Sequence, residues 1–258
     1  MAKKGCVARP CDHFEIVNRS LIQPPLPPEN AVFLDIDGTL LDLASPPTAV
    51  IVPPNLPRLL QRLSQRHGGA IALISGRALA DIDGMFGPGF AVAAEHGAVL
   101  RDASGEVLSS TLPSSALAGM ADELRAAVAA KPGALLEEKK YGLVLHWRGS
   151  PEHAGALIEL AAKCAAAHPE LVLQAAHDAL EIRIGGTDKA SALETFMSLA
   201  PFTGRVPVFV GDDLTDEAAI ARAAMLGGYG LHVHRSFNGS PAAVRAWLAA
   251  SLADEGGA

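Results

Sequence analysis

Short apolar runs that alternate with helical patterns constrain this chain more than any other feature of its sequence. Residues 31–36 and 70–74 have the pattern of buried strands, and leucines at 56, 59, 60 and 63 recur between them at the spacing of one helix face. A third apolar run covers residues 90–94. Strands that alternate with helices in this way are typical of a parallel α/β sheet. We therefore predict such a sheet as the core of the protein.

The order of the predicted elements changes in the middle of the chain. A hairpin pattern at 99–107 leads into an alanine-rich helical stretch at about 114–130, followed by strand patterns near Leu135 and at 142–147. A helical stretch at 151–168 and strands around Leu171 and Leu180 complete this region. After residue 186 the alternation resumes, with a helix at 191–199, a strand at 207–210 and a terminal helix after Pro241. This order predicts an inserted, mostly antiparallel second domain.

We therefore divide the chain into a core of residues 30–110 and 186–258 and a cap of residues 111–185. Residues 1–29 end in a proline-rich stretch, and we expect them to be a poorly ordered lead-in. The two crossings between core and cap, near Thr111 and at Gly185-Gly186, are the expected hinges for cap closure.

Composition excludes several classes of function. The formal net charge of −7, with 21 Lys and Arg residues among 258, argues against a nucleic-acid partner, because phosphate-backbone binding needs clustered basic residues. No apolar run approaches the roughly 20 residues that span a bilayer, so we expect no membrane partner. Three cysteines are an odd number that does not suggest a disulfide framework, and we expect a cytoplasmic protein with reduced thiols.

Three of the predicted strands end in polar clusters. The clusters are Asp35-Ile36-Asp37-Gly38-Thr39, Ser75-Gly76-Arg77 and Gly211-Asp212-Asp213-Leu214-Thr215-Asp216. Ligands of an open parallel sheet bind beyond the carboxyl ends of its strands, so we expect the three clusters to meet in one crevice.

Crowded carboxylates repel one another unless a cation joins them, and oxygen ligands without His or Cys suit Mg²⁺. Asp35 and Asp212 are the natural carboxylate ligands. Lys189 offers a fixed positive charge, and the hydroxyls of Thr39 and Ser75 can donate to phosphoryl oxygens. Gly76 lets backbone amides approach a phosphate.

These clusters together with Lys189 resemble, in order and spacing, the four motifs of the haloacid dehalogenase superfamily. The resemblance implies a Rossmann-like core with an inserted α+β cap. It also implies that Asp35 is the nucleophile and that Asp37 is the general acid and base. The implied Mg²⁺ ligands are Asp35, Asp37 and Asp212, supported by two further carboxylates, those of Asp213 and Asp216.

A closer resemblance, over about residues 31–247, is to the trehalose-6-phosphate phosphatases. It is carried by the strings AIALISGR (70–77), HGA (96–98), LVLHWR (143–148), EIR (181–183) and PVFVGDDLTDE (207–217). It implies Mg²⁺-dependent hydrolysis of trehalose 6-phosphate, with Glu137, Lys139 and Glu181 of the cap binding glucose hydroxyls. Gly76 and Arg77 are the substrate-binding residues expected in the core. Glu138 and Lys140 have the same spacing as Glu137 and Lys139, and the sequence does not choose between the two pairs.

Two other hypotheses stay open at this stage. One is a phosphatase of another sugar phosphate, such as sucrose phosphate or mannosyl phosphoglycerate. The other is a catalytically silent domain that binds a partner of trehalose synthesis, with trehalose-phosphate synthase as the expected partner. The complete set of Asp35, Asp37, Lys189 and Asp212 favours an enzyme.

Overall fold

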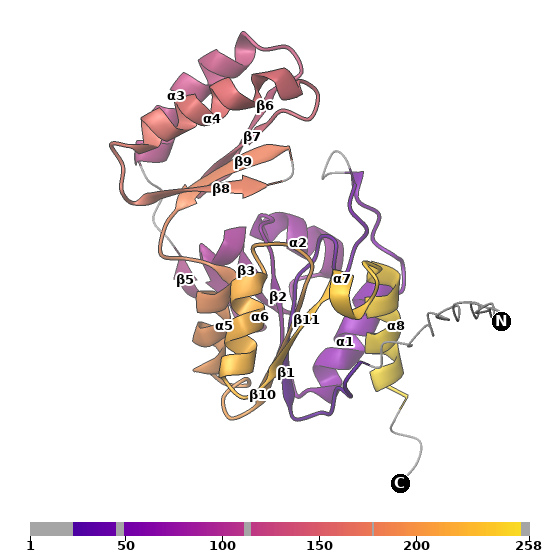
Figure 1. Ribbon diagram of the computed structural model, residues 1–258. Coiled ribbons are helices and arrows are strands. Elements are labelled where there is room, and N and C mark those ends of the chain that lie inside the picture. The colour runs from indigo at the N-terminus through magenta and orange to yellow at the C-terminus, as the bar shows by residue number, and fades with distance from the viewer. Residues whose placement is uncertain (1–22, 45–48, 111–114, 177, 254–258) are drawn as a thin grey trace, which may run out of the picture.

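Two β-sheets of different construction carry the fold in the computed structural model, which describes residues 23–44, 49–110, 115–176 and 178–253 (Figure 1). The larger sheet has seven strands in the order β11-β10-β1-β2-β3-β4-β5. Its first five strands are parallel, and β4 and β5 form an antiparallel hairpin at the edge. The strands are β1 (Asn30–Leu34), β2 (Ile71–Ile74), β3 (Ala91–Ala94), β4 (Val99–Arg101), β5 (Val107–Ser110), β10 (Val206–Gly211) and β11 (Tyr229–His232).

Helices cover both faces of this larger sheet because its strands are apolar on both sides. Val32 and Leu34 of β1 belong to the buried cluster on one face, whereas Phe33 packs on the other face against Phe196 and Phe202. The first face is covered by α1 (Leu56–Arg66), α2 (Leu79–Phe86), α7 (Val233–Ser236) and α8 (Pro241–Ser251), and the second by α5 (Lys189–Met197) and α6 (Glu217–Met225). The carboxyl ends of the parallel strands are thereby left open for a site.

The smaller sheet is antiparallel and has the order β6-β7-β9-β8. It consists of β6 (Leu135–Glu138), β7 (Gly142–His146), β8 (Leu171–Ala176) and β9 (Ala179–Ile184), with α3 (Ser115–Ala129) and α4 (Ala154–Ala165) packed on one face. Leu145, Trp147 and Ile182 are buried against these helices. Figure 1 shows this layer above the larger sheet, with its helices on the side away from the core. The charged face of the smaller sheet is therefore turned toward the core.

The predicted fold class, a parallel α/β core with an inserted α+β cap, is confirmed by this arrangement. The prediction missed the strand β11, which contains Gly230 and follows Gly227-Gly228, because such glycines interrupt the strand pattern. All strands of the smaller sheet lie within residues 111–185, and we keep these limits of the cap as a proposal. The proposed hinge at Thr111 and residues 1–22 of the lead-in lie outside the described residues.

Residues 23–28 of the proline-rich stretch are held by side chains of the core. Trp247 donates its indole N–H to the carbonyl oxygen of Pro24 at 3.1 Å, and the hydroxyl of Tyr229 donates to that of Pro25 at 2.8 Å. Leu26 is buried in the cluster beneath α1 and α8. The end of the lead-in therefore belongs to the packed core. Over the described ranges, no helix combines the length and the apolar character that crossing a membrane requires.

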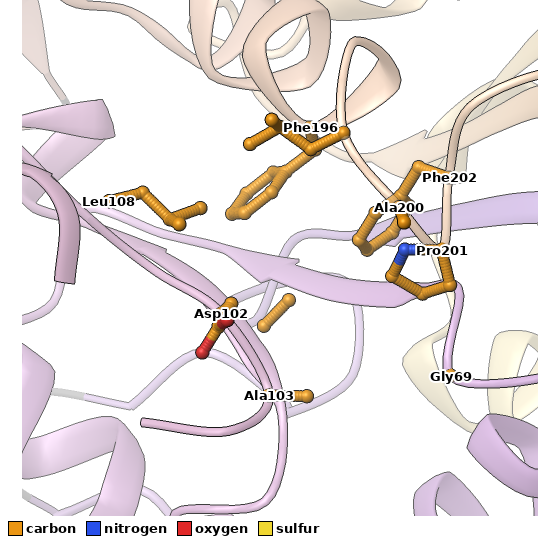
Figure 2. A pocket seen from close by; sticks show the side chains of 10 residues that line it. Gly69, Asp102, Ala103, Leu108, Phe196, Ala200, Pro201 and Phe202 are labelled. Carbon is orange, nitrogen blue, oxygen red and sulfur yellow. The ribbon is translucent and has the colours of Figure 1, made fainter. Parts of the chain in front are cut away.

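A cavity of about 150 Å³ lies where the strands β2 and β3 begin. This is the end of the larger sheet opposite the strand ends that carry the polar clusters. Figure 2 shows the ring of Phe196 and the side chains of Leu108 and Pro201 around it. Its charged lining group, Asp102, already accepts hydrogen bonds from the amides of Ser104 and Glu106, both at 2.9 Å. This cavity offers apolar surface and no reactive group.

Candidate active site

Two adjacent parallel strands bring distant parts of the sequence together. β1 pairs with β10 in the register Leu34↔Val210, and the amide of Asp35 continues the pairing by donating to the carbonyl oxygen of Val210 at 3.0 Å. Asp35 therefore leaves β1 beside Asp212, which directly follows β10. Both side chains are buried.

Lys189 is the cation at the centre of this group. It is the first residue of α5, whose start is fixed by a capping box between Asp188 and Ser191. The ammonium of Lys189 donates to Oδ1 of Asp35 at 2.8 Å and to Oδ1 of Asp216 at 2.7 Å, and the residue is only 3% exposed. Burial alone would lower the pKa of Lys189, but the two carboxylates raise it above its ordinary value. Lys189 is therefore a fixed positive charge.

Asp216 organises the loop that follows β10. Its Oδ2 accepts hydrogen bonds from the amides of Asp212 at 3.0 Å and Asp213 at 3.1 Å. Asp213 accepts hydrogen bonds from the amide and hydroxyl of Thr215. Asp216 is fully buried, so this loop is built around a charged pair with Lys189.

Three of these carboxylates form one compact acidic group. Asp35, Asp212 and Asp216 each offer an oxygen within 4.8 Å of the other two. Burial raises the pKa of Asp35 well above its ordinary value although Lys189 lowers it, and burial with the nearby Asp213 and Asp216 raises the pKa of Asp212 to about 6. One ammonium thus does not neutralise the group. Its donors are all carboxylate oxygens, the ligand type that hard divalent cations prefer.

Asp37 stands apart from this acidic group. Its two carboxylate oxygens accept from Nε and Nη2 of Arg77, both at 2.6 Å, in a bidentate pair. The amide of Arg77 in turn donates to the hydroxyl of Ser75 at 3.2 Å. The second polar cluster is therefore joined to the first through Arg77, whereas the hydroxyl of Thr39 donates to Oδ1 of Asp212 at 3.4 Å.

Two of the cap residues expected to bind the sugar, Lys139 and Glu181, contact core residues that follow β2 and β3. Lys139 donates to the carbonyl oxygen of Gly76 at 3.1 Å and lies 3.5 Å from a carboxylate oxygen of Glu181. Glu137 lies 2.9 Å from Nε2 of His146. Glu138, in contrast, pairs with the exposed Arg125 of α3 on the helix side of the sheet. Glu137 and Glu138, one from each of the two pairs that the sequence left open, therefore have different partners on the two sides of the smaller sheet.

Two residues that touch the cap were not among the predicted site residues. Glu95 and His96 follow β3, at the same edge of the sheet as the three polar clusters. Oε2 of Glu95 accepts from the amide of Tyr141 at 3.0 Å, and Nε2 of His96 lies 3.0 Å from Oε2 of Glu181. The rule that strand ends carry the site could have found both.

Comparisons with known proteins agree with this geometry. The profile of the family described as trehalose-phosphatase matches residues 33–238. The chain is 38% identical over 232 residues to the trehalose-6-phosphate phosphatase of Escherichia coli K12. The aligned region covers 90% of this chain and 85% of that protein.

Solved structures share the fold. The C-terminal domain of the trehalose-6-phosphate phosphatase of C. albicans has a TM-score of 0.71 at 20% identity, over 87% of this chain and 92% of that one. A haloacid dehalogenase-like hydrolase from Bacteroides thetaiotaomicron has a TM-score of 0.57 at 16% identity, over 74% and 84%. At these identities the likeness concerns the fold alone, and it agrees with the haloacid dehalogenase core predicted from the sequence.

The close approach of Asp216 to the backbone predicts the effect of adding one methyl group. A Cβ at Gly211 would lie 2.3 Å from Cγ of Asp216, which is held by two amides and by Lys189. Gly211→Ala should therefore destabilise the core by about 1–3 kcal/mol, measured by urea unfolding. Gly119→Ala on α3 is the matched control, since its Cβ meets nothing within 4 Å, and it should stabilise by about 0.5–1 kcal/mol. A Gly211→Ala protein with the wild-type midpoint would contradict this account of the loop.

Proposed function

We propose, since the chain belongs to the trehalose-phosphatase family, that it hydrolyses trehalose 6-phosphate to trehalose and phosphate. The observation that carries the proposal is the buried ammonium of Lys189 between Asp35 and Asp216, beside Asp212. Phosphoryl transfer depends on positioning and on neutralising charge, and this group supplies a placed carboxylate and a fixed cation.

Mg²⁺ is the cofactor we propose. Asp35, Asp212 and Asp216 offer grouped carboxylate oxygens with more negative charge than Lys189 balances, which fits a hard divalent cation. Asp35 and Asp212 are the proposed ligands, with Asp213 and Asp216 shaping the loop around them. Asp37 is the third proposed ligand, and in this structure its two carboxylate oxygens accept hydrogen bonds from Arg77. When bound, the ion neutralises charge on the phosphate and keeps the carboxylate of Asp35 ionised.

The first half of the proposed reaction transfers the phosphoryl group to the protein. A carboxylate oxygen of Asp35 bonds to phosphorus while the bond from phosphorus to the sugar oxygen breaks, giving an aspartyl phosphate. Asp37, released from Arg77 and in its protonated form, donates its proton to the departing sugar oxygen. Lys189 keeps Asp35 in place, and the hydroxyls of Thr39 and Ser75 donate to phosphoryl oxygens.

The second half releases phosphate. Asp37 takes a proton from water, whose oxygen bonds to phosphorus as the bond to Asp35 breaks. Asp35 returns to its carboxylate form and phosphate leaves with the added oxygen. We propose that Arg77, paired with Asp37 in this structure, also binds phosphate, because a guanidinium matches both groups through two parallel hydrogen bonds.

The cap supplies the sugar-binding groups of the proposal. Glu137 and Glu181 flank Val144 in one cross-strand row on the face of the smaller sheet that is turned to the core, and Lys139 lies in the turn after β6. Charged groups that hydrogen-bond neutral hydroxyls discriminate strongly, because a ligand lacking a hydroxyl leaves them unpaired. Gly76 completes the crevice, since its carbonyl oxygen meets Lys139.

We also propose a trehalose-phosphate synthase as partner, because an enzyme that makes this sugar phosphate must supply it. A cytoplasmic location is proposed as well, and the free thiol of Cys164 is compatible with it.

The substrate is tested with a panel of phosphate esters. With Mg²⁺ present, kcat/KM for trehalose 6-phosphate should exceed that for glucose 6-phosphate by at least about 100-fold, because the cap has polar groups for a second sugar. Sucrose 6-phosphate and mannosyl phosphoglycerate complete the panel. An equal or higher kcat/KM for either would overturn the substrate and leave the phosphatase chemistry intact.

The nucleophile is tested by Asp35→Asn. This substitution keeps the shape of the side chain and removes its negative charge, so kcat should fall roughly 10⁴-fold or more. Asp122→Asn on the exposed surface of α3 makes the same chemical change and should leave kcat within about twofold. Circular dichroism checks that both variants fold, and a folded Asp35→Asn protein with wild-type kcat would refute the role of Asp35.

The proposed metal site predicts a pH-dependent stabilisation by Mg²⁺. At about ten times its Kd, Mg²⁺ should stabilise the protein by about 1.4 kcal/mol, or roughly 3–6 °C in melting temperature. The gain should be larger at pH 7.5 than at pH 5, because Asp212, whose pKa is raised to about 6, is protonated at the lower pH and protons compete with the ion. Asp212→Asn should abolish the gain and Asp122→Asn should retain it. A melting temperature that does not change on addition of Mg²⁺ at either pH would count against the site.

A further inference from the structure

Two residues of the core that the proposed reaction does not use have an unfavourable backbone conformation. Glu95 and His96 have φ angles of 47° and 55°, in the left-handed region that residues other than glycine rarely adopt. Hydrogen bonds hold them there: the amide of Glu95 donates to the carbonyl oxygen of Arg77, and that of His96 to the carbonyl oxygen of Ser75, both at 3.0 Å. Two consecutive residues of this kind beside a candidate site point to a functional constraint.

His96 reaches from Ser75-Gly76-Arg77, which we call the phosphate-binding cluster of the core because of its proposed role, to the cap. Its ring packs against Gly76, where a Cβ would lie only 2.3 Å from Nε2. The same Nε2 lies 3.0 Å from Oε2 of Glu181, and the two side chains are 12% and 11% exposed. Any side chain at position 76 would therefore displace the ring that contacts Glu181.

Glu95 holds a second part of the cap. Its Oε2 accepts from the amide of Tyr141 at 3.0 Å, in the turn between β6 and β7. Lys139 lies in the same turn, and its ammonium reaches Gly76 and Glu181. The turn that carries Lys139 is thus fixed to the core at two points.

The charge of Glu181 is also set by groups from both the core and the cap. Burial alone would raise its pKa, but contact with His96 and the nearby charge of Lys139 lower it to about 2. Glu181 is therefore an ionised acceptor at neutral pH, and its direction is set by a group from the core and a group from the cap.

We infer that Glu95 and His96 are positioning residues, which hold Glu181 and the Lys139 turn at a set place above the phosphate-binding cluster so that sugar and phosphate are bound at a fixed separation. The inference rests on the proposed function, in which Glu181 and Lys139 bind the sugar. Substrate recognition by the cap then depends on two core residues that act through the cap residues they hold.

A double-mutant cycle tests this coupling. The proteins are wild type, His96→Leu, Glu181→Gln and the double variant, with His96→Gln as the conservative variant. Leu and Gln carry the same backbone cost at a positive φ, so the comparison isolates the side-chain donor, which Gln retains. Rates are measured with trehalose 6-phosphate and with p-nitrophenyl phosphate, which has no sugar for the cap to bind.

For trehalose 6-phosphate, His96→Leu should lower kcat/KM about tenfold or more, mainly through a higher KM, and His96→Gln should recover most of the loss. The rate with p-nitrophenyl phosphate should stay within about twofold of wild type. In the Glu181→Gln background the same His96→Leu change should cost less than about threefold, because its partner is already altered. Additive losses, or equal losses on both substrates, would overturn the inference.

Two further measurements keep the outcome decisive. If His96→Leu does not fold, Glu95→Ala should raise KM in the same selective way, and a Glu95→Ala protein with unchanged KM would overturn the inference.

If the wild-type protein hydrolyses p-nitrophenyl phosphate but not trehalose 6-phosphate, the proposed substrate fails. Small-angle scattering of the ligand-free proteins then decides: a larger radius of gyration for His96→Leu supports the positioning role, and an unchanged radius refutes it.

Discussion

The buried ammonium of Lys189 is the interaction on which the rest of this site depends. It joins the start of α5 to Asp35 at the end of β1 and to Asp216 after β10, so three separate parts of the chain meet at one charge. Burying an ammonium is costly unless it is paired, and here both partners are buried with it. Removing either carboxylate would leave the cation less compensated, and removing Lys189 would leave a concentrated negative charge.

The small residues around the site follow from this charged group. Gly38 has a positive φ, and a Cβ there would lie 2.0 Å from Oδ2 of Asp212. Gly211 makes a similar approach to Asp216. The backbone therefore packs directly on the carboxylates and shields them from water, which strengthens electrostatic interactions within the site. Burial also raises the pKa values of Asp212 and Asp216, the two carboxylates on which the glycines pack.

The side chains of Lys189 and Arg77 differ in geometry. Lys189 is a compact charge between two buried carboxylates, whereas Arg77 presents a planar fork to the half-exposed Asp37. A guanidinium that pairs with a carboxylate through two hydrogen bonds can bind a phosphate in the same way, which agrees with the proposed role of Arg77. The cap adds a second level of organisation, because its charged face meets the core through Gly76, Glu95 and His96.

The sequence by itself determined the alternation of strands and helices and the polar clusters at three strand ends, because these patterns act over a few residues. It also indicated the inserted cap. Only the tertiary structure decided which cap residues face the core: Leu135 and Leu136 are both apolar and Glu137 and Glu138 both acidic, so a period of two selects neither face of β6. The pairing of His96 with Glu181 joins the short turn after β3 to strand β9 of the smaller sheet, whose other face is covered by α3 and α4. Local patterns do not record packing between elements that are distant in the chain, and that packing placed the charged face of the smaller sheet above the polar strand ends of the larger sheet.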